Sequence, residues 1–447
     1  MSTEMDAGRS ENGVRATRVI KFGGTSVTGG DRIDTIESVV RERLESKRPV
    51  LVVSAFAHIT TLLETTALAA CTGTHHAGFA DLRAVHLDAI ESMTRSAPTS
   101  SLVVELLLAE CFDCLEAISA AGVCSAADMD EVLSFGERLS SSIIAEGLVV
   151  RGIDATPVDA AALVVTDDAF GHARADLAAT RRQAEAVLPG ASTVPVVTGF
   201  IGATPNRART TLGREGSDYS AAVLGWALDA DEVEIWTDVD GVKTADPRVV
   251  DDVLSLRHLS YDALYELANR GAKVVHPNTL RPLRERAIPL SIRNTLSRHA
   301  PGTRVGGEAR ASDFIPSWLG VTQMPSRTVL DGRPLDGGLE GLDQVDTPFV
   351  LVTAIRNIDS ASSDGQPDAE PITVAHLADA LLDTGVAVLN RPGGSVSGST
   401  ASSISFAVAP EDGDAAVRAL HGRLFGHIPR RQRHTTDSRY SHAGCDS

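Results

Sequence analysis

The chain has 447 residues, with 41 lysines and arginines against 59 aspartates and glutamates, which gives a formal net charge of −18. This balance argues against a broad nucleic-acid surface, because phosphate backbones are bound by clustered Lys and Arg. A hydrophobic content of 43% and a charged content of 22% are typical of a globular protein and exclude a wholly disordered or fibrous chain.

Membrane spans, a secretion signal and a disulfide framework in the sequence would each bear on where the protein is located. No stretch approaches the roughly 20 uninterrupted apolar residues that a membrane helix needs. The polar residues 1–16 lack the apolar core of a secretion signal, and we expect them to form a disordered tail. Five cysteines are too few for a disulfide framework. We therefore predict a cytoplasmic protein with no membrane partner and no nucleic-acid partner.

The first ordered segment is typical of a βαβ unit. A strand over Thr17–Lys21 leads into a glycine-rich turn. Asp31 is then placed to cap a helix, and Val50–Val53 is a buried strand. This order of elements predicts a parallel sheet covered by helices.

The same pattern continues along the chain. We expect further strands and helices at Val194–Thr198, Asp218–Leu228, Glu232–Trp236, Tyr261–Arg270 and Ile288–Ile292. Residues 17–305 are therefore predicted to form one α/β domain.

The sequence pattern changes after Pro301-Gly302 and the loop Gly306–Ser312, which mark a predicted domain boundary. The expected elements beyond it are strands Phe349–Ile355, Val386–Asn390 and Ser402–Val408 and helices Val374–Leu382 and Ala415–Leu424. They predict a small α+β module over residues 313–428. We expect Asp359–Glu370 to be a loop and residues 429–447 to be a disordered tail.

Lys21 lies at the end of the first strand, directly before Phe22 and the pair Gly23-Gly24. Ligands collect at the carboxyl ends of strands in open α/β sheets. Glycines there let backbone N–H groups approach a polyphosphate, and a lysine supplies a compact positive charge. The alternative is a tight turn with a solvated lysine.

The segment Thr210–Ser220 is the most informative one. Small residues lead into a helix, whose free N–H groups attract an anion. Arg214 could hold a carboxylate through two hydrogen bonds. Asp218 falls in the first helical turn, where local rules alone favour a helix cap. The neighbouring Arg214 and small residues favour a binding site instead.

A turn-rich loop follows the strand Glu232–Trp236 and could hold a nucleotide. Asp238 would meet ribose or base, and Arg248 the phosphates, while Lys273 offers another positive charge. By loop composition alone, solvated loop charges are the more frequent case. Glu137 borders the apolar face of a predicted helix, and most glutamates so placed only reach solvent.

The cysteines and histidines give weak metal patterns. Cys111 and Cys114 form a C-x-x-C inside an apolar helical stretch, and we interpret them as buried thiols. Cys71 with His75 and His76 is also a weak pattern. We assign no metal held by the protein.

At these motifs the chain resembles the aspartate kinases of the amino acid kinase superfamily. The matching motifs, in family order, are Val19–Val27, Val52–Ala55 with Thr60, Gly136-Glu137, Leu212–Arg214 with Gly216–Asp218, Trp236–Asp238 with Asp246–Arg248, Gly271–Pro277 and Asn294-Thr295. The resemblance covers essentially residues 17–305.

The resemblance implies a three-layer αβα domain with a mainly parallel sheet, followed by a smaller α+β, ferredoxin-like ACT-like domain. It implies transfer of the γ-phosphoryl of ATP to the β-carboxylate of L-aspartate, giving 4-phospho-L-aspartate, the first step toward lysine, threonine and methionine. Mg²⁺ would arrive with ATP, and the protein would be a homodimer.

The resemblance also implies residue roles. Lys21 and Asp218 would serve phosphoryl transfer. The substrate would be bound by Ser54, Thr60, Glu137, Arg214 and Ser217. ATP would be bound by Lys21, Phe22, Gly23, Gly24, Thr237, Asp238, Lys243, Arg248, Lys273 and Val274.

Three residues depart from the family pattern. His58 and Glu215 stand where glycine or another small residue is usual, and Lys243 replaces a frequent tyrosine. The C-terminal region is short for the paired ACT modules of the family. A kinase of another amino-acid carboxylate and a non-catalytic regulatory homologue therefore remain as alternatives.

Overall fold

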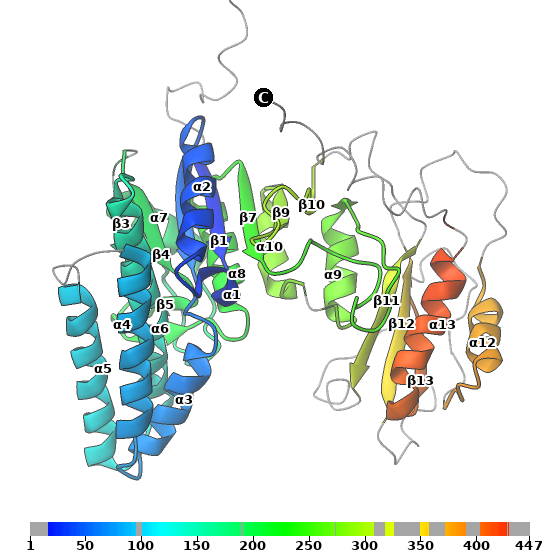
Figure 1. The fold of residues 1–447 in the computed structure, drawn as a ribbon, viewed down its shortest axis with the longest axis horizontal. Coiled ribbons are helices and arrows are strands. Elements are labelled where there is room, and N and C mark those ends of the chain that lie inside the picture. The colour runs from blue at the N-terminus through cyan, green and yellow to red at the C-terminus, as the bar shows by residue number, and fades with distance from the viewer. Residues whose placement is uncertain are drawn as a thin grey trace, which may run out of the picture. The chain divides into compact units, whose positions relative to one another are not determined.

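The computed structural model (Figure 1) describes residues 17–94, 101–188, 190, 192–272, 274–307, 318–325, 349–356, 372–389, 403–426 and 428. The two predicted tails, the loop 359–370 and Lys273 lie outside the described residues. The chain divides into two compact units, and each is described by itself. One comprises residues up to Asp240 with Val275–Gly307, and the other Gly241–Val274 with the chain from Glu308 onward.

The first unit contains most of the regular structure. Its strands are β1 (Thr17–Phe22), β2 (Arg48–Val53), β3 (Ala155–Val158), β4 (Val194–Thr198), β5 (Ile201–Ala203), β6 (Arg209–Thr211), β7 (Glu232–Thr237), β9 (Leu290–Asn294) and β10 (Thr303–Val305). Its helices are α1 (Gly24–Val27), α2 (Arg32–Leu44), α3 (Ile59–Ala70), α4 (His76–Thr94), α5 (Ser101–Ala121), α6 (Ala126–Val150), α7 (Leu177–Val187), α8 (Gly216–Ala227) and α10 (Pro277–Glu285), with a 3₁₀ turn at η1 (Ala160–Ala162).

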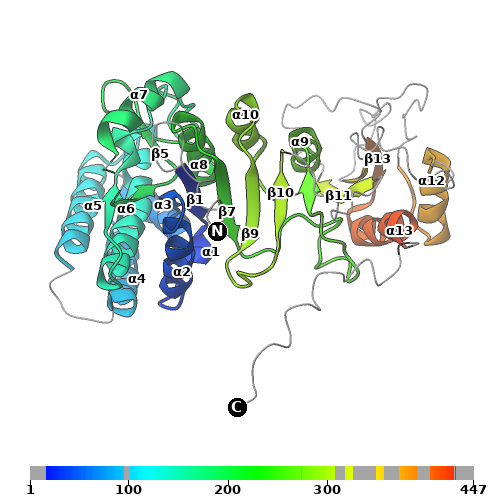
Figure 2. The ribbon, with the colours of Figure 1, turned by 90° about the horizontal axis from the view of Figure 1, so that it is seen from above.

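The main sheet of this unit follows the order β3-β4-β2-β1-β7-β9-β10. All neighbouring pairs are parallel except β9 and β10. Helices α7, α8 and α10 lie on one side of the sheet, and α2 and α4 lie on the other (Figure 2). The predicted three-layer αβα architecture with a mainly parallel sheet is confirmed.

The core of the first unit lies between the sheet and the helices α2 to α6. Strand β1 is buried from Val19 to Phe22, as expected for a central strand with helices on both faces. Helix α6 packs closely against the segment after β2, because a Cβ at Gly136 would lie 2.8 Å from the Ala55 Cβ. This glycine sets the position of its neighbour Glu137.

The second unit contains strands β8 (His258–Leu259), β11 (Trp318–Pro325), β12 (Val350–Arg356) and β13 (Ser403–Val408), helices α9 (Tyr261–Asn269), α12 (Val374–Asp383) and α13 (Gly413–Phe425), and the 3₁₀ turn η4 (Pro410–Asp412). Strands β11, β12 and β13 form an antiparallel sheet in that order. The predicted small α+β architecture of the C-terminal part is confirmed.

The segment Gly241–Val274 belongs to the second unit, whereas the sequence places it in a domain over residues 17–305. Its apolar side chains Ala245, Val250 and Leu254 share a core with the β11–β13 sheet. The Val321 N–H also donates to the Thr244 carbonyl at 2.8 Å. The compact units therefore divide the chain differently from the predicted domains, whose functional boundaries stay predictions.

Most predicted elements match within a few residues, with two differences. Asp31 precedes α2, but its side chain caps no backbone N–H group. The expected strand Val386–Asn390 is reduced to an isolated bridge between Val388 and Val408, and Asn390 lies outside the described residues. Among the described helices, none combines the length and apolar character that crossing a bilayer requires.

The interpretation of the C-x-x-C residues is confirmed for Cys111, which is fully buried. Burial is the main cause that raises the pKa of its thiol to about 12. Cys114 is only half-buried, and both are free thiols. A thiol with a raised pKa is a poor nucleophile and metal ligand, so Cys111 is a packing residue.

Candidate active site

Four parallel strands of the first unit end at the same edge of the sheet. The register pairs Phe22 at the end of β1 with Val53 of β2 and Trp236 of β7. It also pairs Val53 with Thr198 of β4. The residues that follow these strands therefore come together where ligands bind in open α/β sheets.

The turn after β1 is tied to the end of β7. The Gly23 N–H donates to the Trp236 carbonyl at 3.0 Å. A Cβ on Gly24 would lie 3.0 Å from the Ala55 carbonyl oxygen, so a side chain here would push these two backbones apart by a few tenths of an ångström. A Cβ on Gly23 would lie 3.4 Å from Lys21 Nζ, which places the lysine head group beside the turn.

Lys21 and Asp218 form a buried ion pair. Lys21 Nζ lies 2.5 Å from Asp218 Oδ1, and the two residues are 8% and 6% exposed. Asp218 comes from the first turn of α8, but the N-cap of that helix is Glu215, so the helix-cap alternative for Asp218 is wrong. The alternative of a solvated lysine is also wrong, because Lys21 is buried and paired.

The segment before α8 presents Arg214 to solvent. Gly213 and Glu215 both adopt left-handed backbone, with φ of 78° and 55°. Among the described residues, no hydrogen bond or ion pair engages the Arg214 guanidinium, so it is available to a ligand. Ser217 is buried and lies against Gly199, where a Cβ would come within 2.8 Å of Ser217 Oγ.

Glu137 is a buried carboxyl with few partners. It is 3% exposed, and its Oε1 accepts the Ala55 N–H at 3.0 Å. Its Oε2 is buried and has no hydrogen-bond partner among the described residues. Burial raises the pKa of Glu137 to about 8, although the Ala55 N–H and the charge of Lys21 act in the opposite direction. The structure therefore contradicts a glutamate that merely reaches solvent.

The segment after β2 borders the same edge. The Ser54 N–H donates to the Phe22 carbonyl at 3.2 Å, and the Ser54 carbonyl accepts from Ser140 Oγ at 2.8 Å. Thr60 is exposed in the first turn of α3. His58, the N-cap of α3, has a φ of 69°, which explains why glycine suits this position.

The residues predicted to bind nucleotide fall in both units. Thr237 ends β7 in the first unit, and its Oγ1 donates to Asp238 Oδ1 at 3.2 Å. Of the last two residues predicted to bind nucleotide, Lys273 lies outside the described residues, and Val274 is half-buried in the second unit.

Lys243 and Arg248 also belong to the second unit. Lys243 Nζ donates to Ser255 Oγ at 2.8 Å. Arg248 is exposed and pairs with Asp246 at 2.6 Å, and this carboxylate raises the pKa of the guanidinium. Their predicted contact with the nucleotide stays a prediction.

Two hydroxyl residues that the sequence-based role assignment omits support the turn after β1. Thr295 Oγ1 donates to Ser26 Oγ at 2.6 Å, and Ser26 Oγ donates to the Trp236 carbonyl at 3.2 Å. The Thr295 N–H donates to the Thr237 carbonyl at 2.8 Å. Both hydroxyls occur in the family-like motifs, so the motif was the signal that could have found them.

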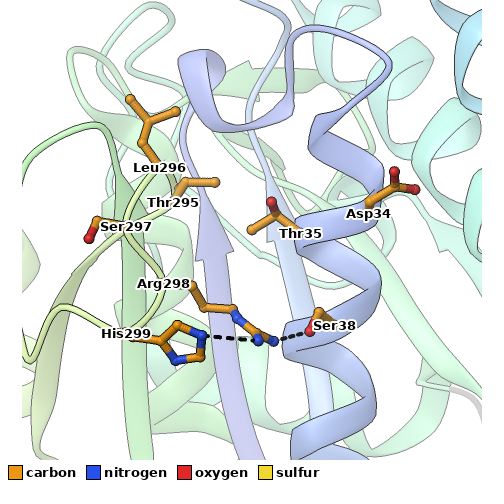
Figure 3. A pocket seen from close by; sticks show the side chains of 8 residues that line it. All are labelled: Asp34, Thr35, Ser38, Thr295, Leu296, Ser297, Arg298 and His299. Carbon is orange, nitrogen blue, oxygen red and sulfur yellow. Dashed lines mark hydrogen bonds between the residues drawn. The ribbon is translucent and has the colours of Figure 1, made fainter. Parts of the chain in front are cut away.

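A pocket of about 520 Å³ lies beside this support, between α2 and the segment after β9 (Figure 3). It is lined by Asp34, Thr35, Ser38, Thr295, Leu296, Ser297, Arg298 and His299. The Arg298 guanidinium contacts Ser38 Oγ and lies 3.4 Å from His299 Nε2. None of the predicted site residues lines this pocket, but Thr295 belongs both to its lining and to the support of the turn after β1.

Comparisons with known proteins agree with this geometry. The sequence model described as "Amino acid kinase family" matches residues 16–294. The chain is 36% identical to lysine-sensitive aspartokinase 3 of Escherichia coli over 289 residues, which cover 64% of this chain and 63% of that protein. It is 30% identical to a chloroplastic bifunctional aspartokinase/homoserine dehydrogenase of Arabidopsis thaliana over 421 residues, 91% of this chain and 42% of that protein. The chain thus spans less than two thirds of the length of these relatives.

A solved structure is similar over nearly the whole chain. E. coli aspartokinase III in complex with aspartate and ADP superposes with a TM-score of 0.74 at 27% sequence identity. The match covers 92% of this chain and 100% of that one.

Proposed function

The chain belongs to the amino acid kinase family, and we propose that it acts as an aspartate kinase. It would transfer the γ-phosphoryl of ATP to the β-carboxylate of L-aspartate and release 4-phospho-L-aspartate and ADP. The observation that carries the proposal is the buried pair of Lys21 and Asp218, 2.5 Å apart beside the Gly23 turn. The similarity to aspartokinase III with aspartate and ADP supports the choice of substrates.

The chemistry needs positive charge more than a base. A β-carboxylate has a pKa near ~3.9 and is already ionised and nucleophilic at neutral pH. The difficulty is bringing this anion against the γ-phosphate, so positioning and charge stabilisation dominate the rate. Lys21 supplies a fixed cation, and Asp218 holds its ammonium in place.

The amino acid would be recognised by a guanidinium and by a buried carboxyl group. The Arg214 guanidinium, which is exposed, matches a carboxylate with two parallel hydrogen bonds. Glu137 has a buried oxygen without a partner, and a substrate ammonium would supply both its missing hydrogen bond and a compensating charge. Ser54, Thr60 and Ser217 complete the proposed acceptor site.

Mg²⁺ would arrive with ATP, because it keeps several waters and prefers phosphate oxygens to an all-protein cage. Asp218 is a carboxylate at this sheet edge and could orient a Mg²⁺-bound water as well as Lys21. The ACT-like character of the second unit, the homodimer and the cytoplasmic location stay predictions. The β11–β13 antiparallel sheet supports the ACT-like assignment.

A kinase of another amino-acid carboxylate is the second candidate. It is favoured by His58 and Glu215, which hold left-handed backbone beside Thr60 and Arg214 and place large side chains where small ones are usual. A non-catalytic homologue is disfavoured because Lys21, Arg214 and Asp218 are all present.

The test is steady-state ADP release with L-aspartate and a panel of other amino-acid carboxylates. We expect aspartate to give the highest kcat/KM. Lys21→Ala should lower kcat at least about 100-fold, the usual cost of losing one preorganised group that stabilises transition-state charge.

Lys47→Ala is the matched control, because Lys47 also pairs with an aspartate, Asp231, at 2.6 Å but lies just before the opposite end of β2. It should leave kcat unchanged. Unchanged turnover in Lys21→Ala would remove the role of Lys21. A higher kcat/KM for another acid would replace aspartate by that acid.

A further inference from the structure

The turn between α3 and α4 meets α5 at three potential metal ligands. They are His75 and His76 at the start of α4 and Glu116 on α5, and one ligand atom from each lies within 4.8 Å of the others. His75 Nε2 lies 2.8 Å from Glu116 Oε1. No other group of three such residues with this spacing is found in the described part of the chain.

The turn that carries the histidines is well fixed. The Phe79 N–H donates to the His75 carbonyl at 3.0 Å. A Cβ on Gly78 would lie 2.3 Å from Thr66 Oγ1, so α4 packs on α3 without a gap. The ring of Phe112, one helical turn before Glu116 on α5, lies 5.9 Å from each imidazole. The ligands are therefore held by packed elements and not by a loose loop.

The polar groups of the cluster lack other partners. His75 is 1% exposed, and its Nδ1 is buried without a hydrogen bond in the described structure. Glu116 is 49% exposed, and no described lysine or arginine pairs with its carboxylate. A half-exposed carboxylate beside two imidazoles thus has one hydrogen bond to His75 and no cation.

We propose that His75, His76 and Glu116 form a binding site for Zn²⁺ or a divalent metal of similar preference. Two imidazole nitrogens and one carboxylate oxygen are a set that zinc accepts, with water in the remaining position. Mg²⁺ and Ca²⁺ prefer oxygen ligands only. By joining the α3–α4 turn to α5, the metal would stabilise the fold. The site shares no residue with the proposed active site.

The cluster differs in one member from the weak pattern in the sequence. The sequence associates the two histidines with Cys71, but the Cys71 thiol contacts the Ala67 carbonyl at 3.8 Å and is absent from the cluster. The third ligand is Glu116, which only the packing of α5 brings near.

The experiment is isothermal titration of ZnCl₂ into the full chain, freed of affinity tag and stripped of metal with EDTA. We expect one saturable equivalent that excess MgCl₂ does not displace. His76→Ala and Glu116→Gln should each lower the affinity at least about 10-fold, the usual effect of disturbing a metal site. Both residues are exposed, so the variants should fold. Glu91→Gln, an exposed glutamate elsewhere on α4, should leave the affinity unchanged.

A melting curve gives a second readout. Zinc should raise the melting temperature of the parent chain, because only the folded state brings the ligands together, and should not raise that of either variant. Absence of saturable zinc binding would overturn the site. So would a zinc equivalent that both variants retain, since it would lie elsewhere. Neither result bears on kinase turnover.

Discussion

Two buried glutamates of the first unit occupy opposite environments. Glu234, in the middle of β7, is fully buried and receives hydrogen bonds from Arg18, Arg43 and the Trp236 indole, each at 2.9 Å. Burial would raise its pKa, but the hydrogen bond and charge of Arg43 outweigh burial and lower it. Glu137 has one backbone donor and a pKa of about 8.

This difference in partners distinguishes a glutamate that stabilises the fold from one that is available to a ligand. The network around Glu234 compensates the negative charge of this carboxylate within the protein itself. It also holds Trp236, whose carbonyl accepts the Gly23 N–H, so the network supports the turn from behind. Glu137 is left without a cation bonded to it, which costs stability and is typical of a position that a ligand completes.

The largest expected effect comes from making the same change at both positions. Glu234→Gln should lower the free energy of unfolding at pH 7 by about 3–5 kcal/mol, because it leaves the buried Arg43 and the half-buried Arg18 beside a neutral group. Glu137→Gln should not lower it and should raise it, because the amide matches the neutral carboxyl of the folded state, whereas the unfolded parent chain is stabilised at pH 7 by ionising this group. Urea denaturation measures both.

Equal losses in the two variants would show that Glu137, like Glu234, stabilises the fold through its charge. For aspartate binding, the substitution at Glu137 should have the larger effect of the two. Glu137→Gln should raise the aspartate KM, whereas folded Glu234→Gln should retain aspartate binding.

The next largest expected effect is that the two glutamates make the stability of the fold depend on pH in opposite directions. The folded pKa of Glu137 is raised from 4.5 to about 8, so the folded state binds a proton that the unfolded state has released between these pH values. Its contribution to stability is full below pH 4.5 and is lost as pH rises toward 8. Glu234, with a lowered pKa, contributes stability above pH 4.5 that is lost as pH falls through its folded pKa.

Unfolding free energies of the parent chain and Glu137→Gln, compared between pH 5 and pH 9, measure this slope. The parent chain should lose stability relative to the variant as pH rises. A constant difference across this range would show that Glu137 is charged in the folded state throughout.

The sequence predicts the strands and helices that form the edge of the sheet at the candidate active site, but it does not predict the side-chain contacts between them. The strand before Gly23 and the helix from Asp218 follow local patterns, because apolar periodicity and turn residues act over a few positions. The contact between Lys21 and Asp218 joins residues far apart in the chain, and only the family resemblance indicated their common role. The burial of Glu137 depends on Gly136 packing against Ala55, which no spacing rule contains.

Tertiary packing also decides the division of the chain. The segment 241–274 carries the Asp246–Arg248 motif and was predicted to belong to one domain with Lys21. Its apolar residues, such as Val250 and Leu254, pack with the β11–β13 sheet instead. Hydrophobic periodicity predicts that one face of a segment is buried, but it does not predict which other element of the fold that face packs against.

The smallest expected effect concerns the backbone around the site. Glu234 lies in a regular strand, whereas His58 and Glu215 hold left-handed backbone before α3 and α8. Left-handed backbone costs a non-glycine residue about 1–2 kcal/mol of conformational free energy. His58→Gly and Glu215→Gly should each raise the free energy of unfolding, by up to about 1 kcal/mol after the extra entropy of glycine in the unfolded chain.

Glu64→Gly is the matched control, because Glu64 is exposed inside α3, where glycine should cost about 0.5–1 kcal/mol. Burial and the nearby Asp218 raise the pKa of Glu215, so its carboxylate is disfavoured where it stands. Removing it in Glu215→Gly should also lower the aspartate KM, because Arg214 then faces the substrate carboxylate without a competing charge. If both glycine variants lost stability as Glu64→Gly does, the two side chains would hold these turns through contacts that outweigh the backbone strain.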